Sequence, residues 1–200
     1  MSSANYRELI GASGYRHNAW AKHIRRKIQK SHNIGILGTR ISAIDLVMKL
    51  KASNQTGKIK LFSRSGLLPS VLAKKITPIP LQQSYLKKIE AMRGKHGKLP
   101  LEHLVDFILN EISIAQGKSI QFDTILSSHK QIQAQDWLEK EIRSAEANNK
   151  PWQQILLSFY PLIPKVWTYL TVKDKQIFLQ KYHTLFLTYL AGIPLENAKK

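Results

Sequence analysis

A short stretch near the N-terminal end of the chain has the residue order of a phosphate-binding turn. The segment 33–45 reads NIGILGTRISAID, so an apolar run stops at Gly38 and an amphipathic pattern begins a few residues later. Turns of this kind, between a strand and a helix, bind the pyrophosphate of a dinucleotide through backbone amides. The chemistry that these residues indicate is therefore the binding of a nucleotide cofactor.

The turn matches the dinucleotide fingerprint at two of its three small-residue positions. In the pattern Gly-x-Gly-x-x-Gly/Ala, the second glycine lets the backbone approach the phosphates and the last small residue lets helix and strand pack closely. Gly38 takes the first position, where it can adopt the positive φ that a tight turn often needs. Ala43 takes the last position, but Arg40 stands at the second. The Arg40 side chain either blocks the phosphates or binds them through its guanidinium group, and the sequence leaves both possibilities open. The residues predicted to hold the pyrophosphate are Gly38, Thr39, Arg40, Ser42 and Ala43.

A second group of candidate residues follows the next apolar run and consists of Ser63, Arg64 and Ser65. In NAD-binding proteins of this type, an Asp or Glu near this place accepts the ribose 2′-hydroxyl. The chain has no carboxylate here, and Arg64 is suited to the 2′-phosphate of NADP. We therefore expect NADP rather than NAD as the cofactor. The alternative is that Arg64 is a solvated charge at the end of a strand.

The elements that must position these residues follow from the hydrophobic periodicity. The pattern predicts a strand at 34–37, a helix from Ile41 to Leu50 and a strand at 58–64. In the second strand, Ile59 and Leu61 are expected on one face and Lys60 on the other. These elements span about thirty residues, which is the size of a βαβ unit. Further helices are predicted at 84–93, 101–115, 130–147, 152–159 and 172–190, with Pro161 and Pro164 as interruptions and with an amphipathic basic segment at 20–29.

The predicted fold class is α/β, with a Rossmann-like βαβ unit followed by a mostly α-helical C-terminal region. We expect an N-terminal connecting segment at 1–32, a Rossmann-like NAD(P)-binding region at 33–125 and a helical C-terminal region at 126–200. Trp137, Trp152 and Trp167 fall at helical positions, where we expect them to anchor the core rather than to bind a ligand.

Composition excludes several kinds of chemistry. The chain has no cysteine, so disulfides, thiolate metal sites and cysteine nucleophiles are ruled out. The seven histidines show neither the spacing of metal ligands nor a Ser-His-Asp arrangement, and we predict no metal site and no catalytic residue. The sequence shows no signal-peptide pattern and no run of about 18 apolar residues, which predicts a cytoplasmic protein without a membrane partner.

The net charge of +18, from 31 Lys and Arg against 13 Asp and Glu, has two interpretations. It is either a solvated basic surface or a means of attracting phosphates, including those of a nucleic acid. The positive charges are spread along the chain, and no zinc-finger or helix-turn-helix pattern accompanies them. Nucleic acid is therefore the less favoured partner, although the charge does not exclude it.

Several segments together resemble one protein family. The turn GTRISAID at 38–45 is similar to a GTGLTAID-like turn, and SRSGLLP at 63–69 is similar to an SRRGLLP-like strand end, both typical of bacterial FAD/NAD(P)-binding flavoproteins. Shorter matches to the same family follow at 152–155, 160–161, 166–167 and 176–179. The resemblance covers about residues 33 to 190. Members of this family look like distant relatives of the flavin-dependent monooxygenases.

The resemblance implies an NAD(P)H-dependent flavoprotein oxidoreductase in which the flavin carries the redox chemistry. Residues 1–32 do not contain the glycine fingerprint that members of the family use for FAD, so FAD is expected only through a missing segment or a partner chain that supplies an FAD domain. The chain then represents a truncated NAD(P)-side portion that binds a dinucleotide. The alternatives are a non-catalytic basic binding module with a degenerate dinucleotide site and a nucleic-acid-binding protein.

Overall fold

The computed structural model describes residues 8–21, 28–76, 82–94, 96–121 and 132–200. The chain divides into two compact units, a smaller one that ends at Phe62 and a larger one that runs from Ser63 to Lys200 and includes residues 39–41. The predicted boundaries at 1–32, 33–125 and 126–200 stay predictions. Most of the basic segment predicted at 20–29 lies outside the described residues.

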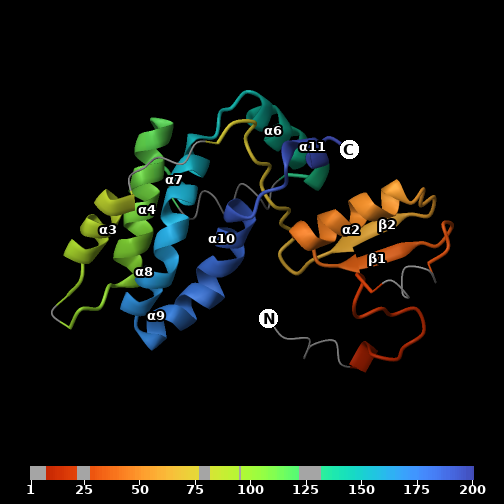
Figure 1. Cartoon of the computed structure of the whole chain (residues 1–200), viewed down its shortest axis with the longest axis horizontal. Helices are drawn as coiled ribbons and strands as arrows, with labels where there is room; N and C mark the ends of the chain where they lie inside the picture. Colours follow the sequence, from red (N-terminus) through yellow and green to blue (C-terminus); the bar gives the residue numbers. More distant parts are fainter. Residues whose placement is uncertain (1–7, 22–27, 77–81, 95, 122–131) are drawn as a thin grey trace. The chain divides into compact units, whose positions relative to one another are not determined.

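The smaller unit contains a strand, a helix and a second strand. Strand β1 (Ile34–Leu37), helix α2 (Ile41–Ala52) and strand β2 (Ile59–Phe62) confirm the three predicted elements. The two strands are parallel neighbours, with Ile34 opposite Ile59 and Leu37 opposite Phe62. Figure 1 shows α2 running along one face of this two-stranded sheet, where the buried residues are Ile36, Ala43 and Leu50.

The β2 strand is held against the chain that precedes β1 by a close backbone approach at Gly57. The amides of Thr56 and Gly57 both donate to the carbonyl oxygen of Lys30, at 2.8 and 3.0 Å. A Cβ atom added at Gly57 would lie 1.9 Å from the carbonyl oxygen of His32, so only glycine fits at this position. The strand itself alternates as predicted, with Ile59 and Leu61 half-buried and Lys60 exposed.

The larger unit is mostly helical, as predicted. Its helical segments are α3 (Gln82–Ala91), α4 (Leu101–Gln116), α6 (Ala134–Glu146), α7 (Pro151–Phe159), η2 (Tyr160–Leu162), α8 (Ile163–Tyr169), α9 (Val172–Ile177), η3 (Phe178–Tyr182), α10 (His183–Leu190) and α11 (Leu195–Ala198). No helix among the described residues combines the length and the apolar composition that crossing a membrane requires.

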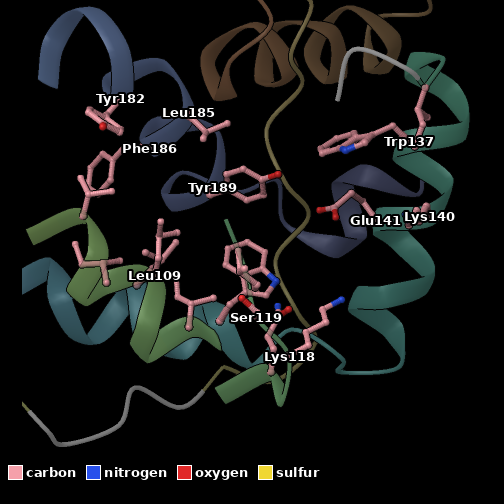
Figure 2. Close-up of a pocket in the computed structure, with 18 of the residues that line it drawn as sticks. Leu109, Lys118, Ser119, Trp137, Lys140, Glu141, Tyr182, Leu185, Phe186 and Tyr189 are labelled. Atoms are coloured by element: carbon pink, nitrogen blue, oxygen red, sulfur yellow. The ribbon is translucent and has the colours of Figure 1, made fainter. Parts of the chain in front are cut away.

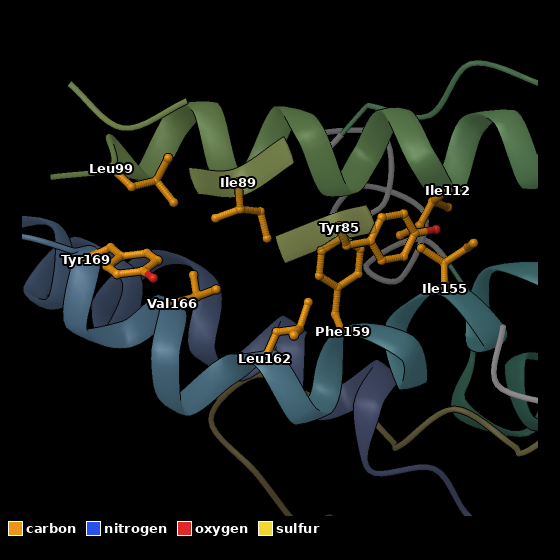
Figure 3. Close-up of a cluster of buried hydrophobic side chains, with 9 residues drawn as sticks. All are labelled: Tyr85, Ile89, Leu99, Ile112, Ile155, Phe159, Leu162, Val166 and Tyr169. Atoms are coloured by element: carbon orange, nitrogen blue, oxygen red, sulfur yellow. The ribbon is translucent and has the colours of Figure 1, made fainter. Parts of the chain in front are cut away.

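The core of the larger unit is formed where α3, α4, α7 and α8 meet. The Tyr85 and Phe159 rings stack with centroids 4.6 Å apart, and the Phe107 ring meets both edge-on. Figure 3 shows this cluster, whose buried members are Tyr85, Ile89, Leu99, Ile112, Ile155, Phe159, Leu162, Val166 and Tyr169. Nine buried residues from several helices give this unit a core of its own.

The helical segments confirm one prediction and depart from another. Pro161 and Pro164 interrupt the predicted helix at 152–159 as expected, because α7 ends at Phe159 and each proline lies in the first turn of a following segment, η2 or α8, where the missing N–H has no intrahelical partner to lose. The helix predicted at 172–190 is divided by η3, a π-helical segment of five residues between α9 and α10. The periodicity of the sequence did not predict this change of helical geometry.

Candidate functional site

The turn after β1 has the backbone conformation that the sequence predicts. Gly38 follows the last residue of β1 and has φ of 124°, which other residues rarely adopt. Its amide donates to the carbonyl oxygen of Phe62 at 2.7 Å, which continues the pairing of the two strands. A Cβ atom added at Gly38 would meet no heavy atom within 4 Å, so the space beside this turn is open.

Thr39 has a structural role that the sequence did not indicate. The residue is 8% exposed, and its hydroxyl donates to the carbonyl oxygen of Leu67 at 2.6 Å. This bond ties the segment before α2 to the segment after β2, two stretches that are 28 residues apart. The Thr39 hydroxyl is therefore engaged within the protein, and only the Thr39 backbone remains for the predicted pyrophosphate contact.

Arg40 and Ser42 stand at the beginning of α2 and are both exposed. The amides of the first turn of an α-helix have no partner within that helix, and the helix dipole favours an anion there. The first turn of α2 contains no acidic residue that would compete with such an anion. Because Arg40 is exposed, its guanidinium group is accessible to a phosphate at this end of the helix.

Ala43 lies on the buried side of α2. It is 9% exposed and belongs to the small cluster with Ile36 and Leu50. A small residue at this position allows the helix to lie close to the strand, which is the role that the fingerprint assigns to its last position. The structure therefore assigns Ala43 a role in helix packing.

The segment after β2 forms an exposed turn that is held by its own serines. The amide of Gly66 donates to Ser63 Oγ at 2.9 Å, and the amide of Leu67 donates to Ser65 Oγ at 3.4 Å. Arg64 lies between these serines and is exposed. Since Leu37 pairs with Phe62, the turns that begin at Gly38 and Ser63 both follow strand ends at the same edge of the sheet.

The larger unit contains a cavity that the sequence did not predict. Its volume is about 580 Å³, and its walls come from α4, α6, α7, η3 and α10 (Figure 2). Trp137 and Trp152, which were expected to anchor the core, both line this cavity. The available signal was the row of aromatic residues in the last predicted helix, but such a row is also typical of a helix that packs on a core.

Beside the cavity, a buried ion pair holds the segment after Pro69 to α6 and to the beginning of α7. The Lys150 ammonium, on a side chain that is 1% exposed, lies 2.5 Å from Glu141 Oε2 and donates to the carbonyl oxygen of Val71 at 2.8 Å. Glu141 also accepts from the Ser70 hydroxyl and the Val71 amide. Burial lowers the pKa of Lys150, whereas the Glu141 carboxylate acts to raise it.

Comparison with known proteins gives one distant relative. No family model matches the chain, and no solved structure matches it. The relative is a protein of Escherichia coli (strain K12) named "Uncharacterized protein YdhS", and it is 22% identical to this chain over an alignment 222 positions long. The match covers 90% of this chain but 41% of that protein, so the chain spans less than half of the relative's length.

Proposed function

We propose that this chain is the NAD(P)-binding portion of a flavin-dependent oxidoreductase, built on a Rossmann-like βαβ unit. The observation that carries the proposal is the turn at Gly38, which has a positive φ, has open space beside it and connects a strand to a helix of 12 residues. This is the arrangement in which backbone amides and a helix dipole bind a pyrophosphate.

The exposed residues of the two turns supply the remaining contacts in this proposal. The backbone from Gly38 to Ser42 would hold the pyrophosphate, and the exposed Arg40 would add a charged hydrogen bond to it. Arg64 would bind the 2′-phosphate, which makes NADP the expected cofactor. The side chains of Thr39 and Ala43 would support the turn without contacting the cofactor. The Thr39 hydroxyl donates to the Leu67 carbonyl, and the Ala43 methyl group is buried.

In this proposal a flavin would supply the redox chemistry, and the residues of this chain would hold and orient the nicotinamide dinucleotide. The part of the chain that would bind FAD is expected in a further segment or in a partner chain. The relative is more than twice as long as the region that it shares with this chain, which is consistent with such a further segment.

The proposal is tested by titrating the protein with NADPH, NADH and FAD and recording binding by calorimetry. We expect NADPH to saturate one site. The Arg64→Gln substitution should lower the affinity for NADPH about tenfold and leave the affinity for NADH unchanged. The Arg40→Gln substitution should lower the affinity for both NADPH and NADH. The matched control is Lys60→Gln, which changes an exposed lysine within β2. If neither dinucleotide binds, the proposal is wrong.

A nucleic-acid-binding protein is the second candidate, and the net charge of +18 favours it. A gel-shift assay with duplex DNA across a salt series distinguishes the two. Retention that falls steeply with salt, in a protein that binds no dinucleotide, would support the second candidate.

A further inference from the structure

The cavity of the larger unit has the dimensions and lining of a small-molecule site. Its volume of about 580 Å³ lies within the range of ligand pockets, which are mostly apolar with a few polar groups at defined places. Six aromatic side chains contribute to the walls, namely Trp137, Trp152, Phe178, Tyr182, Phe186 and Tyr189. Aromatic walls favour a flat apolar ligand, because its faces and edges can pack against rings in offset or perpendicular arrangements.

The π-helical segment η3 shapes one end of this cavity. Phe178, its first residue, makes ring contacts with Tyr182, His183 and Phe186, at centroid distances of 6.5, 6.3 and 5.7 Å. The contact between Phe178 and His183 spans five residues, which is the spacing of a π turn. Short π segments within helices frequently occur at functional sites, and this one supplies Phe178 and Tyr182 to the cavity wall.

The charged lining residues lie away from the η3 end. Figure 2 shows Glu141, Lys140 and Lys118 apart from Tyr182 and Phe186, which lie at the other end. The Glu141 carboxylate is already bound by Lys150, Ser70 and the Val71 amide, so its charge is compensated within the protein.

Lys118 and Lys140 supply the uncompensated charge at this end. Both lysines are exposed, and neither forms an ion pair with any other residue that the structure describes. The polar end of the cavity therefore carries positive charge that is available to an anionic group.

We propose that this cavity binds a small aromatic carboxylic acid. Its ring system lies among Trp152, Tyr182 and Phe186, and its carboxylate lies toward Lys118 and Lys140. An aliphatic acid of similar length would satisfy the lysines but would not use the flat aromatic walls. The cavity shares no residue with the proposed dinucleotide site, so the two sites can be tested with separate substitutions.

The experiment uses calorimetry with the full chain and no nucleotide. The ligand is naphthalene-2-carboxylate, and the comparison ligands are naphthalene-2-carboxamide and decanoate. We expect the carboxylate to saturate one site below about 1 mM, and the carboxamide to bind about tenfold more weakly. Replacement of both lysines, Lys118→Gln with Lys140→Gln, should remove this difference, whereas Lys173→Gln, an exposed lysine of α9 outside the cavity, should preserve it.

A second variant tests whether the ligand occupies the cavity itself. Leu109 lines the cavity from α4, and Leu109→Trp should fill part of it and reduce carboxylate affinity at least tenfold. Circular dichroism checks that this variant is folded, and Leu109→Phe is the smaller replacement if it is not. Decanoate binding as tightly as the naphthalene acid would overturn the aromatic assignment. If none of the three compounds binds, the proposal that the cavity is a ligand site is wrong.

Discussion

The two compact units bury apolar surface to very different extents. In the smaller unit three residues form the buried cluster, and Leu37 and Phe62 at the ends of β1 and β2 remain 53% and 52% exposed. In the larger unit nine buried residues from several helices form the core. Parallel sheets are ordinarily stabilised because both of their faces are buried. A sheet of only two strands has little surface to bury and gains little stability in this way. The unit with the recognisable motif is therefore the one that we expect to be less stable.

The largest expected effect is the loss of a large aromatic side chain from the core of the larger unit. Phe159→Ala removes a ring that stacks on Tyr85 and should lower the free energy of unfolding by about 3–5 kcal/mol. Ile36→Ala in the smaller unit should cost about 2 kcal/mol, because its surroundings can relax toward solvent. Denaturant unfolding followed by circular dichroism measures both. An equal or greater loss at Ile36 would contradict the difference between the units.

The buried ion pair gives the next largest effect. Lys150→Met leaves the Glu141 carboxylate without its buried partner and should cost about 3 kcal/mol in denaturant unfolding. The control is Lys165→Met, which breaks the 2.8 Å pair with Glu90 at the surface and should leave stability unchanged. Similar losses in the two variants would show that the pair at Lys150 has no special role in holding residues 70–71.

A smaller effect, confined to the smaller unit, is expected at Gly57. Gly57→Ala places a Cβ atom against the His32 carbonyl and should cost about 1–3 kcal/mol. Amide hydrogen exchange measures where the loss occurs: the amides of Ile34 and Gly38, which bond to β2 and its flank, should exchange faster. Gly94→Ala is the control, because the nearest atom would be an ordinary 3.8 Å away. Faster exchange throughout α4 and α7 as well would show that the units unfold together.

The smallest effect at neutral pH is expected for Tyr85→Phe. The Tyr85 hydroxyl is buried without a hydrogen-bond partner among the described residues, so its removal should leave stability equal or raise it by about 1 kcal/mol.

The same substitution should change the pH dependence of stability. Burial, together with the nearby Glu111 charge, raises the pKa of Tyr85 to about 12 from its ordinary value of 10.0. The contribution of Tyr85 is therefore complete below pH 10 and is lost as pH rises through 12, because the unfolded chain ionises first. The advantage of Tyr85→Phe over the wild type should grow by about 2 kcal/mol across this interval in denaturant unfolding. A constant difference would contradict the raised pKa.

The sequence predicted correctly those features that depend only on residues close to one another along the chain. The alternation of Ile59, Lys60 and Leu61 and the positive φ of Gly38 are local properties, and the structure confirms both. The hydroxyl of Thr39, in contrast, bonds to a carbonyl 28 residues away, and no local pattern indicates such a partner.

The cavity was missed for the same reason. Its lining extends from Val105 to Tyr189, and each aromatic residue taken alone is consistent with an ordinary core position. The π geometry of η3 depends on packing between helices, whereas the sequence pattern reports only that residues 172–190 are helical and apolar on one side. The dinucleotide and its phosphate contacts stay predictions.

The π-helical segment also affects how this protein tolerates the loss of a residue. Deleting one residue from an ordinary helix turns everything after it by about 100° and misplaces the buried face. Residues 178–182 form a turn that already holds one residue more than an α turn, so a single deletion there can be absorbed by conversion to α-helix. A single deletion at this point would therefore reshape the aromatic wall without loss of the helix that carries it.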